Sequence, residues 1–199
     1  MLKFTLTSLM LAAALNANAS VDLFEDEMGG GSSNDSFATA QNLGNLALGD
    51  VTNVLGGRHE DIPGGNTIDF YKFTVNGTGN FVLNLLTLNS DPGQDQYGRD
   101  PYIGLFDSHG VKLAFDDDAG IGYDSQLSHH ATGPSTFYVG VTGYGNPSFA
   151  VNGGNANWPL YALSIDATNI APVPEPETYA LMGMGLVGLL AARRRKAAK

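Results

Sequence analysis

The chain contains no cysteine among its 199 residues. No disulfide framework can therefore stabilise the fold, and no thiol can act as a nucleophile. Stability must come from the packing of side chains, with or without a bound metal. When both ends are set aside as processing segments, about 150 residues remain, which is the length of one domain with a sizeable core.

Basic residues are scarce between the two ends of the chain. From Asp22 to Asp166 there are four basic and 18 acidic residues, which gives this part a formal charge of −14. Such a charge repels phosphate and carboxylate polymers, so it argues against nucleic-acid binding. Two interpretations of the acidity stay open, namely the solubility of a secreted protein and the binding of calcium.

Long helices are not expected in the central part. The chain has 26 glycines and nine prolines, and this composition indicates frequent turns. Residues 37–43 fit either a capped helical turn or an entry strand. Short runs rich in β-branched and aromatic residues predict strands and an all-β fold, a β-sandwich or jelly roll. These runs cover residues 69–75, 81–88, 102–106, 111–115, 136–142 and 161–165.

Two turns between these runs are well defined by their residues. Asp107–Gly110 supplies an aspartate acceptor and a glycine that tolerates positive φ, so it predicts a hairpin. Asn76–Gly79 joins the runs at 69–75 and 81–88 and predicts a second hairpin on the same grounds.

The N-terminal 19 residues have the form of a secretory signal peptide. Lys3 precedes an apolar stretch, and Ala17 and Ala19 occupy the small positions of a cleavage site. We therefore predict removal of residues 1–19 by signal peptidase. Residues 20–33 are acidic and rich in glycine, with little to bury, and are expected to form a flexible leader.

The C-terminal end combines a linker, an apolar segment and a basic tail. Prolines exclude a helix over 169–178 and predict an extended linker. Residues 179–192 carry no charge and would form about 21 Å of helix, which is short for a hydrocarbon core of about 30 Å. The basic residues of 193–199 place this tail in the cytoplasm and the domain outside. Such a marginal span suits a temporary anchor.

This end resembles the PEP-CTERM sorting signal of Gram-negative bacteria. The resemblance covers Pro172 to Lys199, with the proline motif, the apolar run and the arginine cluster in order. It implies that an exosortase, a membrane-embedded cysteine enzyme, recognises Pro174, Glu175 and Pro176. It also implies a transient inner-membrane anchor, followed by release of the protein to the cell surface or extracellular matrix. An ordinary single-span anchor with a proline-rich stalk is the alternative.

Residues 34–168 are expected to form the β-sandwich, and most of them resemble the bacterial pre-peptidase C-terminal domain. That family is a β-sandwich found beside secreted proteases and in surface proteins. The resemblance lies in the order of several short motifs. They are Asn34–Ser36, Asp69–Phe73, Asp100–Asp107, Asp116–Asp118 and Thr136–Val141.

Calcium is the one cofactor that the sequence suggests. Asp116, Asp117 and Asp118 lie in a loop flanked by glycine, with Asp100 near in sequence, and carboxylate oxygens suit Ca²⁺. Three adjacent side chains point in different directions, so at most two can easily bind one ion. The family resemblance adds a second set of candidates, which are Asn34, Asp35 and Asp69. Solvated acidic turns are the alternative for both sets.

No pattern of catalytic residues stands out. The chain lacks a Gly-x-Ser-x-Gly elbow and a phosphate-binding loop, and the neighbours His129 and His130 would face opposite sides of a strand. We therefore expect a non-enzymatic, exported protein associated with exopolysaccharide, biofilm or floc. The alternatives are a Ca²⁺-dependent carbohydrate- or protein-binding module and, less favoured, a secreted hydrolase. Aromatic candidates for stacking on sugars are Tyr97, Tyr102, Tyr123, Tyr144 and Trp158.

Overall fold

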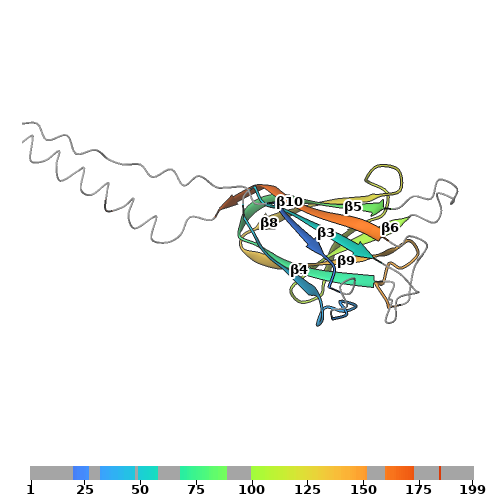
Figure 1. Ribbon diagram of the computed structural model, residues 1–199. Helices are drawn as coiled ribbons and strands as arrows, with labels where there is room; N and C mark the ends of the chain where they lie inside the picture. Colours follow the sequence, from blue (N-terminus) through green and yellow to red (C-terminus); the bar gives the residue numbers. More distant parts are fainter. Residues whose placement is uncertain are drawn as a thin grey trace, which may run out of the picture.

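The computed structural model shows an all-β sandwich, as the sequence predicts. It describes residues 20–26, 32–47, 49–57, 68–88, 100–151, 160–172 and 184. Two five-stranded sheets pack face to face (Figure 1). Apart from Met184, the expected signal peptide, the helix at 179–192 and the basic tail lie outside the described residues. Within the described residues, no helix is long and apolar enough to cross a membrane.

Each sheet combines one parallel pair at an edge with antiparallel neighbours. The first sheet has the order β1 (Ser20–Phe24), β3 (Val51–Gly57), β10 (Leu160–Pro172), β5 (Gly77–Leu88) and β8 (Ser125–Thr132). The second sheet has the order β2 (Gln41–Leu46), β4 (Ile68–Val75), β9 (Ser135–Gly143), β6 (Pro101–Asp107) and β7 (Lys112–Asp116). The parallel pairs are β1 with β3 and β2 with β4.

The main core lies between the two sheets. Alternate residues of the central strands point inward and are fully buried, as in Tyr71, Phe73 and Val75 of β4. Phe73 packs edge-on against Phe81 of the other sheet with ring centroids 5.5 Å apart. Such contacts add to the burial of apolar area, which is the main stabilising term in a chain without disulfides.

A second, aromatic cluster covers the outer face of the second sheet. Phe70, Phe106 and Phe149 belong to it, and Phe37 packs against its edge. Phe149 has a positive φ of 53° and lies over Gly104, where a Cβ atom would come within 2.3 Å of its ring. The glycine therefore leaves room for the ring, which a side chain at this position would displace.

The six strands predicted from sequence are all present, with ends that differ by a few residues or, for β10, by more. Residues 37–43 contain both alternatives. Thr39 N donates to Ser36 O at 3.1 Å in a single turn, and strand β2 begins at Gln41. The hairpin at Asp107–Gly110 is also confirmed. Asp107 Oδ1 accepts hydrogen bonds from His109 N at 2.8 Å and Val111 N at 2.9 Å, and Gly110 has φ of 79°.

The second predicted hairpin is wrong. β4 pairs with β2 and β9, whereas β5 pairs with β10 and β8, so the turn at residue 76 carries the chain from one sheet to the other. Val75 and Phe81 are both fully buried on opposite sides of the main core. Turn residues specify that the chain reverses, and they do not specify which sheet it enters.

The structure differs from the expected leader and linker. Ser20–Phe24 form strand β1, and Leu23 packs against the main core. The Gln41 side chain then holds the end of this strand, because its Nε2 donates to Phe24 O at 2.9 Å. At the other end, β10 continues to Pro172, so residues 169–172 belong to the sheet.

Candidate functional site

Two buried carboxylates lie at one end of the sandwich, close to the start of β4. Asp69 is fully buried and Glu25 is 1 % exposed. The Tyr161 hydroxyl donates to Asp69 Oδ2 at 2.7 Å and shares a further hydrogen bond with the Tyr71 hydroxyl. Because Tyr161 and Tyr71 come from different sheets, this polar group links the two layers of the sandwich. We call Glu25, Asn34, Asp69, Tyr71 and Tyr161 the buried polar cluster.

Backbone groups hold the ends of this cluster in place. Glu25 Oε2 accepts a hydrogen bond from Gly57 N at 2.7 Å, and Glu25 N donates to Leu55 O at 2.9 Å. Asn34 is fully buried, and its carbonyl oxygen accepts from Phe70 N at 2.8 Å. Hydrogen bonds to a charged carboxylate are among the stronger ones in proteins, so they offset part of the cost of burying Glu25.

Burial raises the pKa of both tyrosines in the cluster well above the usual range, and the charge of Asp69 raises each pKa further. Both hydroxyls therefore stay protonated and act as donors. Of the residues predicted as metal ligands, Asn34 and Asp69 belong to this cluster, while Asp35 is half-buried beside it in sequence. Sequence reasoning did not include Glu25, Tyr71 or Tyr161. Asp69 and Tyr71 share one face of β4, and this two-residue spacing is the signal that could have identified Tyr71.

The second predicted set gathers around the loop that follows β7. The pKa of Asp100 is raised to about 6, first because its carboxyl is partly buried and then because Asp118 and Asp117 are nearby negative charges. Burial, together with Asp117 and Asp116, also raises the pKa of Tyr102. The structure therefore places Asp100 and the three loop aspartates in one acidic neighbourhood.

Hydrogen bonding already occupies part of this acidic loop. Asp116 Oδ2 accepts from Ala119 N at 3.0 Å and from Gln126 N at 2.8 Å, which fixes the loop against β8. No group of three or more His, Asp or Glu side chains in metal-binding geometry occurs among the residues that the structure describes. The described acidic side chains of the two predicted sets thus lie in two separate regions, one between the sheets and one around the loop.

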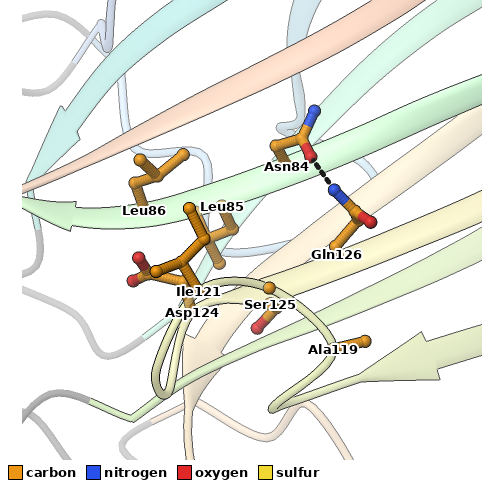
Figure 2. A pocket seen from close by; sticks show the side chains of 9 residues that line it. Asn84, Leu85, Leu86, Ala119, Ile121, Asp124, Ser125 and Gln126 are labelled. Carbon is orange, nitrogen blue, oxygen red and sulfur yellow. Dashed lines mark hydrogen bonds between the residues drawn. The ribbon is translucent and has the colours of Figure 1, made fainter.

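A hollow of about 250 Å³ lies between β5 and the 117–124 loop (Figure 2). At one side of it, Gln126 Nε2 donates to Asn84 Oδ1 at 2.6 Å. Leu86 and Ile121 provide apolar walls, and Figure 2 shows Ile121 on the loop that closes one side. The hollow therefore combines an amide pair with exposed aliphatic groups.

Among the described residues, the histidines do not form a serine–histidine–aspartate relay. His109 Nδ1 lies 3.8 Å from Asp107 Oδ2 and 3.4 Å from Ser108 Oγ, so both contacts involve the same ring nitrogen. A serine–histidine–aspartate relay needs one partner on each nitrogen. His129 packs against the ring of Phe81 at 5.6 Å, and burial, followed by the nearby His130, lowers its pKa.

Of the aromatic residues proposed to stack on sugars, the structure describes Tyr102, Tyr123 and Tyr144, and Tyr123 is partly exposed. Tyr102 is only 6 % exposed because Phe149 and Phe115 pack against its ring at 5.4 and 5.6 Å. Tyr144 is 57 % exposed, and Tyr97 and Trp158 lie outside the described residues. Tyr102 therefore supports the aromatic cluster of the second sheet.

Comparison with known families identifies the C-terminal end. Residues 172–196 match the PEP-CTERM protein-sorting motif. The motif marks an exported protein that an exosortase sorts after a membrane-anchored stage, with the cell surface as its destination. The matched segment begins at the last residue of β10. Ala17, Ala19 and the predicted recognition residues Pro174, Glu175 and Pro176 lie outside the described residues.

The sandwich itself is similar to a solved pre-peptidase C-terminal domain, that of a collagenase from Bacillus anthracis. The two share 17 % sequence identity with a TM-score of 0.41, over 64 % of this chain and 96 % of that one. No curated protein matches the sequence.

Proposed function

We propose that this protein is a non-enzymatic component of the extracellular matrix or biofilm, associated with exopolysaccharide and delivered by exosortase sorting in a Gram-negative bacterium. The observation that carries the proposal is the sorting motif at 172–196, which begins where the folded sandwich ends. Signal peptidase would remove residues 1–19 before or during delivery. The acidic surface of the domain suits a soluble protein in a hydrated matrix.

The structural roles of three carboxylates are consistent with the non-enzymatic part of the proposal. Within the described residues, Asp107 and Asp116 accept backbone hydrogen bonds, and Asp69 accepts from Tyr161. These carboxylates therefore act in turns and between strands. A hydrolase would need a nucleophile or activated water beside a general base.

The sorting step can be tested with two neighbouring glutamates. Glu175→Ala changes the predicted recognition motif, whereas Glu177→Ala changes the same side chain two residues beyond it. We expect the first variant to keep its C-terminal tail and accumulate in the inner membrane, and the second to be processed normally. Intact-mass spectrometry of protein from the matrix and membrane fractions measures both. A wild-type extracellular form that still ends at Lys199 would overturn the sorting proposal.

A second candidate function is a Ca²⁺-dependent carbohydrate- or protein-binding module. The observation that favours it is that Asp100 is partly buried beside Asp118 and Asp117, an arrangement that also raises the pKa of Asp100. A bound cation would relieve the repulsion among these three side chains. Glu25 and Asp69 offer further buried carboxylates at the other acidic region.

Calcium binding is tested by calorimetric titration of the exported protein, with thermal unfolding in Ca²⁺ and in chelator. We expect heat of binding and a higher Tm in Ca²⁺. Asp118→Asn should lose the part of both effects that comes from the loop, and Asp69→Asn should lose the part that comes from between the sheets. The exposed Asp26 provides the matched control, because Asp26→Asn should leave both readouts unchanged. If the wild type shows no heat of binding and no change in Tm with Ca²⁺, this function is ruled out.

A further inference from the structure

A continuous row of polar side chains crosses the outer face of the first sheet. The strand register pairs Asp22 with Asn53, Asn53 with Ser164, Ser164 with Asn84 and Asn84 with Gln126. One residue from each of the five strands therefore contributes, and we call these five residues the polar row. At a strand spacing of 4.7 to 4.9 Å, the row is about 19 Å long.

The polar row is accessible and mostly uncharged. Asp22 and Gln126 are exposed, and the three residues between them are partly exposed. Asn53 Nδ2 donates to Asp22 Oδ1 at 2.9 Å, and Gln126 Nε2 donates to Asn84 Oδ1 at 2.6 Å. The amide nitrogen of Asn84 and the amide oxygen of Gln126 have no further partner among the described residues, so they can bond to a ligand.

An apolar row lies beside the polar one. The same register aligns Phe24, Leu55, Ala162 and Leu86 on the next outward-facing positions. Phe24 is 69 % exposed and Leu86 is 41 % exposed. Parallel bands of hydrogen-bonding and apolar groups match the two kinds of surface on a sugar ring, which has hydroxyl groups at its edge and C–H groups on its faces.

The hollow between β5 and the 117–124 loop stands at one end of both rows. It is lined by Asn84 and Gln126 from the polar row, by Leu86 from the apolar row, and by Ile121, which is 89 % exposed (Figure 2). Its volume of about 250 Å³ suits a single ring more than a large cofactor. A chain lying along the rows would place one unit in this hollow.

The net negative charge of the domain determines which class of polymer this face would bind. The part of the chain from Asp22 to Asp166 has a formal charge of −14, and such a surface repels phosphate and carboxylate polymers. The middle of the polar row is made of neutral amides and a hydroxyl, which bond to sugar hydroxyls without removing a charge from water.

We infer that the outer face of the first sheet binds an uncharged polysaccharide chain, with one sugar unit in the hollow beside Asn84 and Gln126. This inference rests on the proposed role in an exopolysaccharide matrix and names the class of ligand and its surface.

The chain offers a matched pair of variants for the test. Asn84→Ala with Gln126→Ala removes the amide pair at the hollow. Asn80→Ala with His130→Ala removes a similar hydrogen-bonded pair from the same two strands, four residues away, where Asn80 Oδ1 lies 3.0 Å from His130 Nδ1. Both double variants change exposed or partly exposed side chains of β5 and β8, so their Tm values should be similar.

Binding is measured by calorimetry with the processed, exported protein. The probes are the uncharged fraction of the host's matrix polysaccharide, defined hexasaccharides of β-1,4-glucose, β-1,4-mannose and α-1,6-glucose, and alginate as the anionic control. We expect binding to an uncharged probe and none to alginate. The variant at Asn84 and Gln126 should bind about tenfold more weakly, as expected for the loss of two hydrogen bonds, while the control variant should change affinity less than about twofold.

Three outcomes would overturn the inference. They are binding of alginate in preference to every uncharged probe, no binding of any uncharged probe by the wild type, and equal weakening in the two double variants. A concentration-dependent dimer that only the Asn84 and Gln126 variant loses would assign the face to a second copy instead. Each of these results leaves the tail cleavage measured by mass spectrometry unaffected, so failure here is distinct from failure of the sorting proposal.

Discussion

At the scale of single residues, Asp100 is the most informative side chain near the acidic loop. Its pKa of about 6 means that the folded protein binds this proton more tightly than the unfolded chain does. The resulting stabilisation is fully present below about pH 4, the ordinary pKa of aspartate, and is lost as the pH rises through 6. Above pH 6 the charged form remains in the fold at a cost from burial and from Asp118 and Asp117.

Asp100→Asn should therefore raise the Tm at pH 7.5 by a few degrees and leave it almost unchanged at pH 4, because the wild-type side chain is already neutral there. Thermal unfolding of the exported protein from pH 4 to 8, in chelator, measures the difference. Asp26→Asn removes an exposed carboxylate and serves as the control. Its Tm should differ from that of the wild type by the same small amount at every pH. Parallel Tm profiles for wild type and Asp100→Asn across this range would contradict the assignment.

Some residues of the buried polar cluster were accessible to sequence reasoning and others were not. Asn34 and Asp69 came from family resemblance, and Tyr71 follows from the two-residue period of β4. Glu25 gave no signal, because its burial depends on Gly57, a residue 32 positions later that donates to its carboxylate. Local patterns cannot show a partner that the fold brings from so far along the chain.

At the scale of secondary structure, the strands found from sequence are those with a clear apolar or aromatic run. In β4 the residues from Tyr71 to Val75 alternate between buried and partly exposed, whereas β6 is buried at six consecutive positions and forms a continuous run. β8 buries only Ser125, Leu127 and Ala131, and its other side chains are polar, which hides the pattern. β1 is short and depends on parallel pairing with β3, so no local turn indicates it.

Two turns with similar residues lead to different strand connections, which local sequence does not determine. Asp107–Gly110 and Asn76–Gly79 have comparable residues, yet the first closes a hairpin and the second crosses between sheets. In the second case β5 pairs along β10, which lies more than 70 residues later in the chain. Pairing of distant strands therefore sets the topology, while the turn residues only permit the reversal.

At the scale of the whole molecule, the ends of the described chain leave the sandwich on the same side. Ser20 and Asp166 are both aligned with Val51, and β10 then continues beyond this level to Pro172. Ser164 in the polar row lies eight residues before the end of β10, about 25 Å along the strand. The proposed polysaccharide face would thus stand away from the membrane while the sorting tail is still attached.

The short distance between the end of β10 and the sorting motif also restricts how an exosortase can reach the tail. β10 pairs with β5 up to Pro172 and Gly77, so only Val173 separates the strand from Pro174 of the predicted recognition motif. A membrane-embedded exosortase must therefore act within a few ångströms of a folded domain, or the end of β10 must first separate from β5.

We expect an insertion of eight glycine and serine residues between Pro172 and Val173 to speed tail removal, since it gives the enzyme about 15 Å of flexible chain. The same insertion between Ser32 and Ser33 lengthens the protein equally without changing this distance and serves as the control. Pulse labelling with intact-mass detection of the cleaved form gives both rates. Equal rates in the two insertion variants and the wild type would show that the folded strand does not restrict the enzyme.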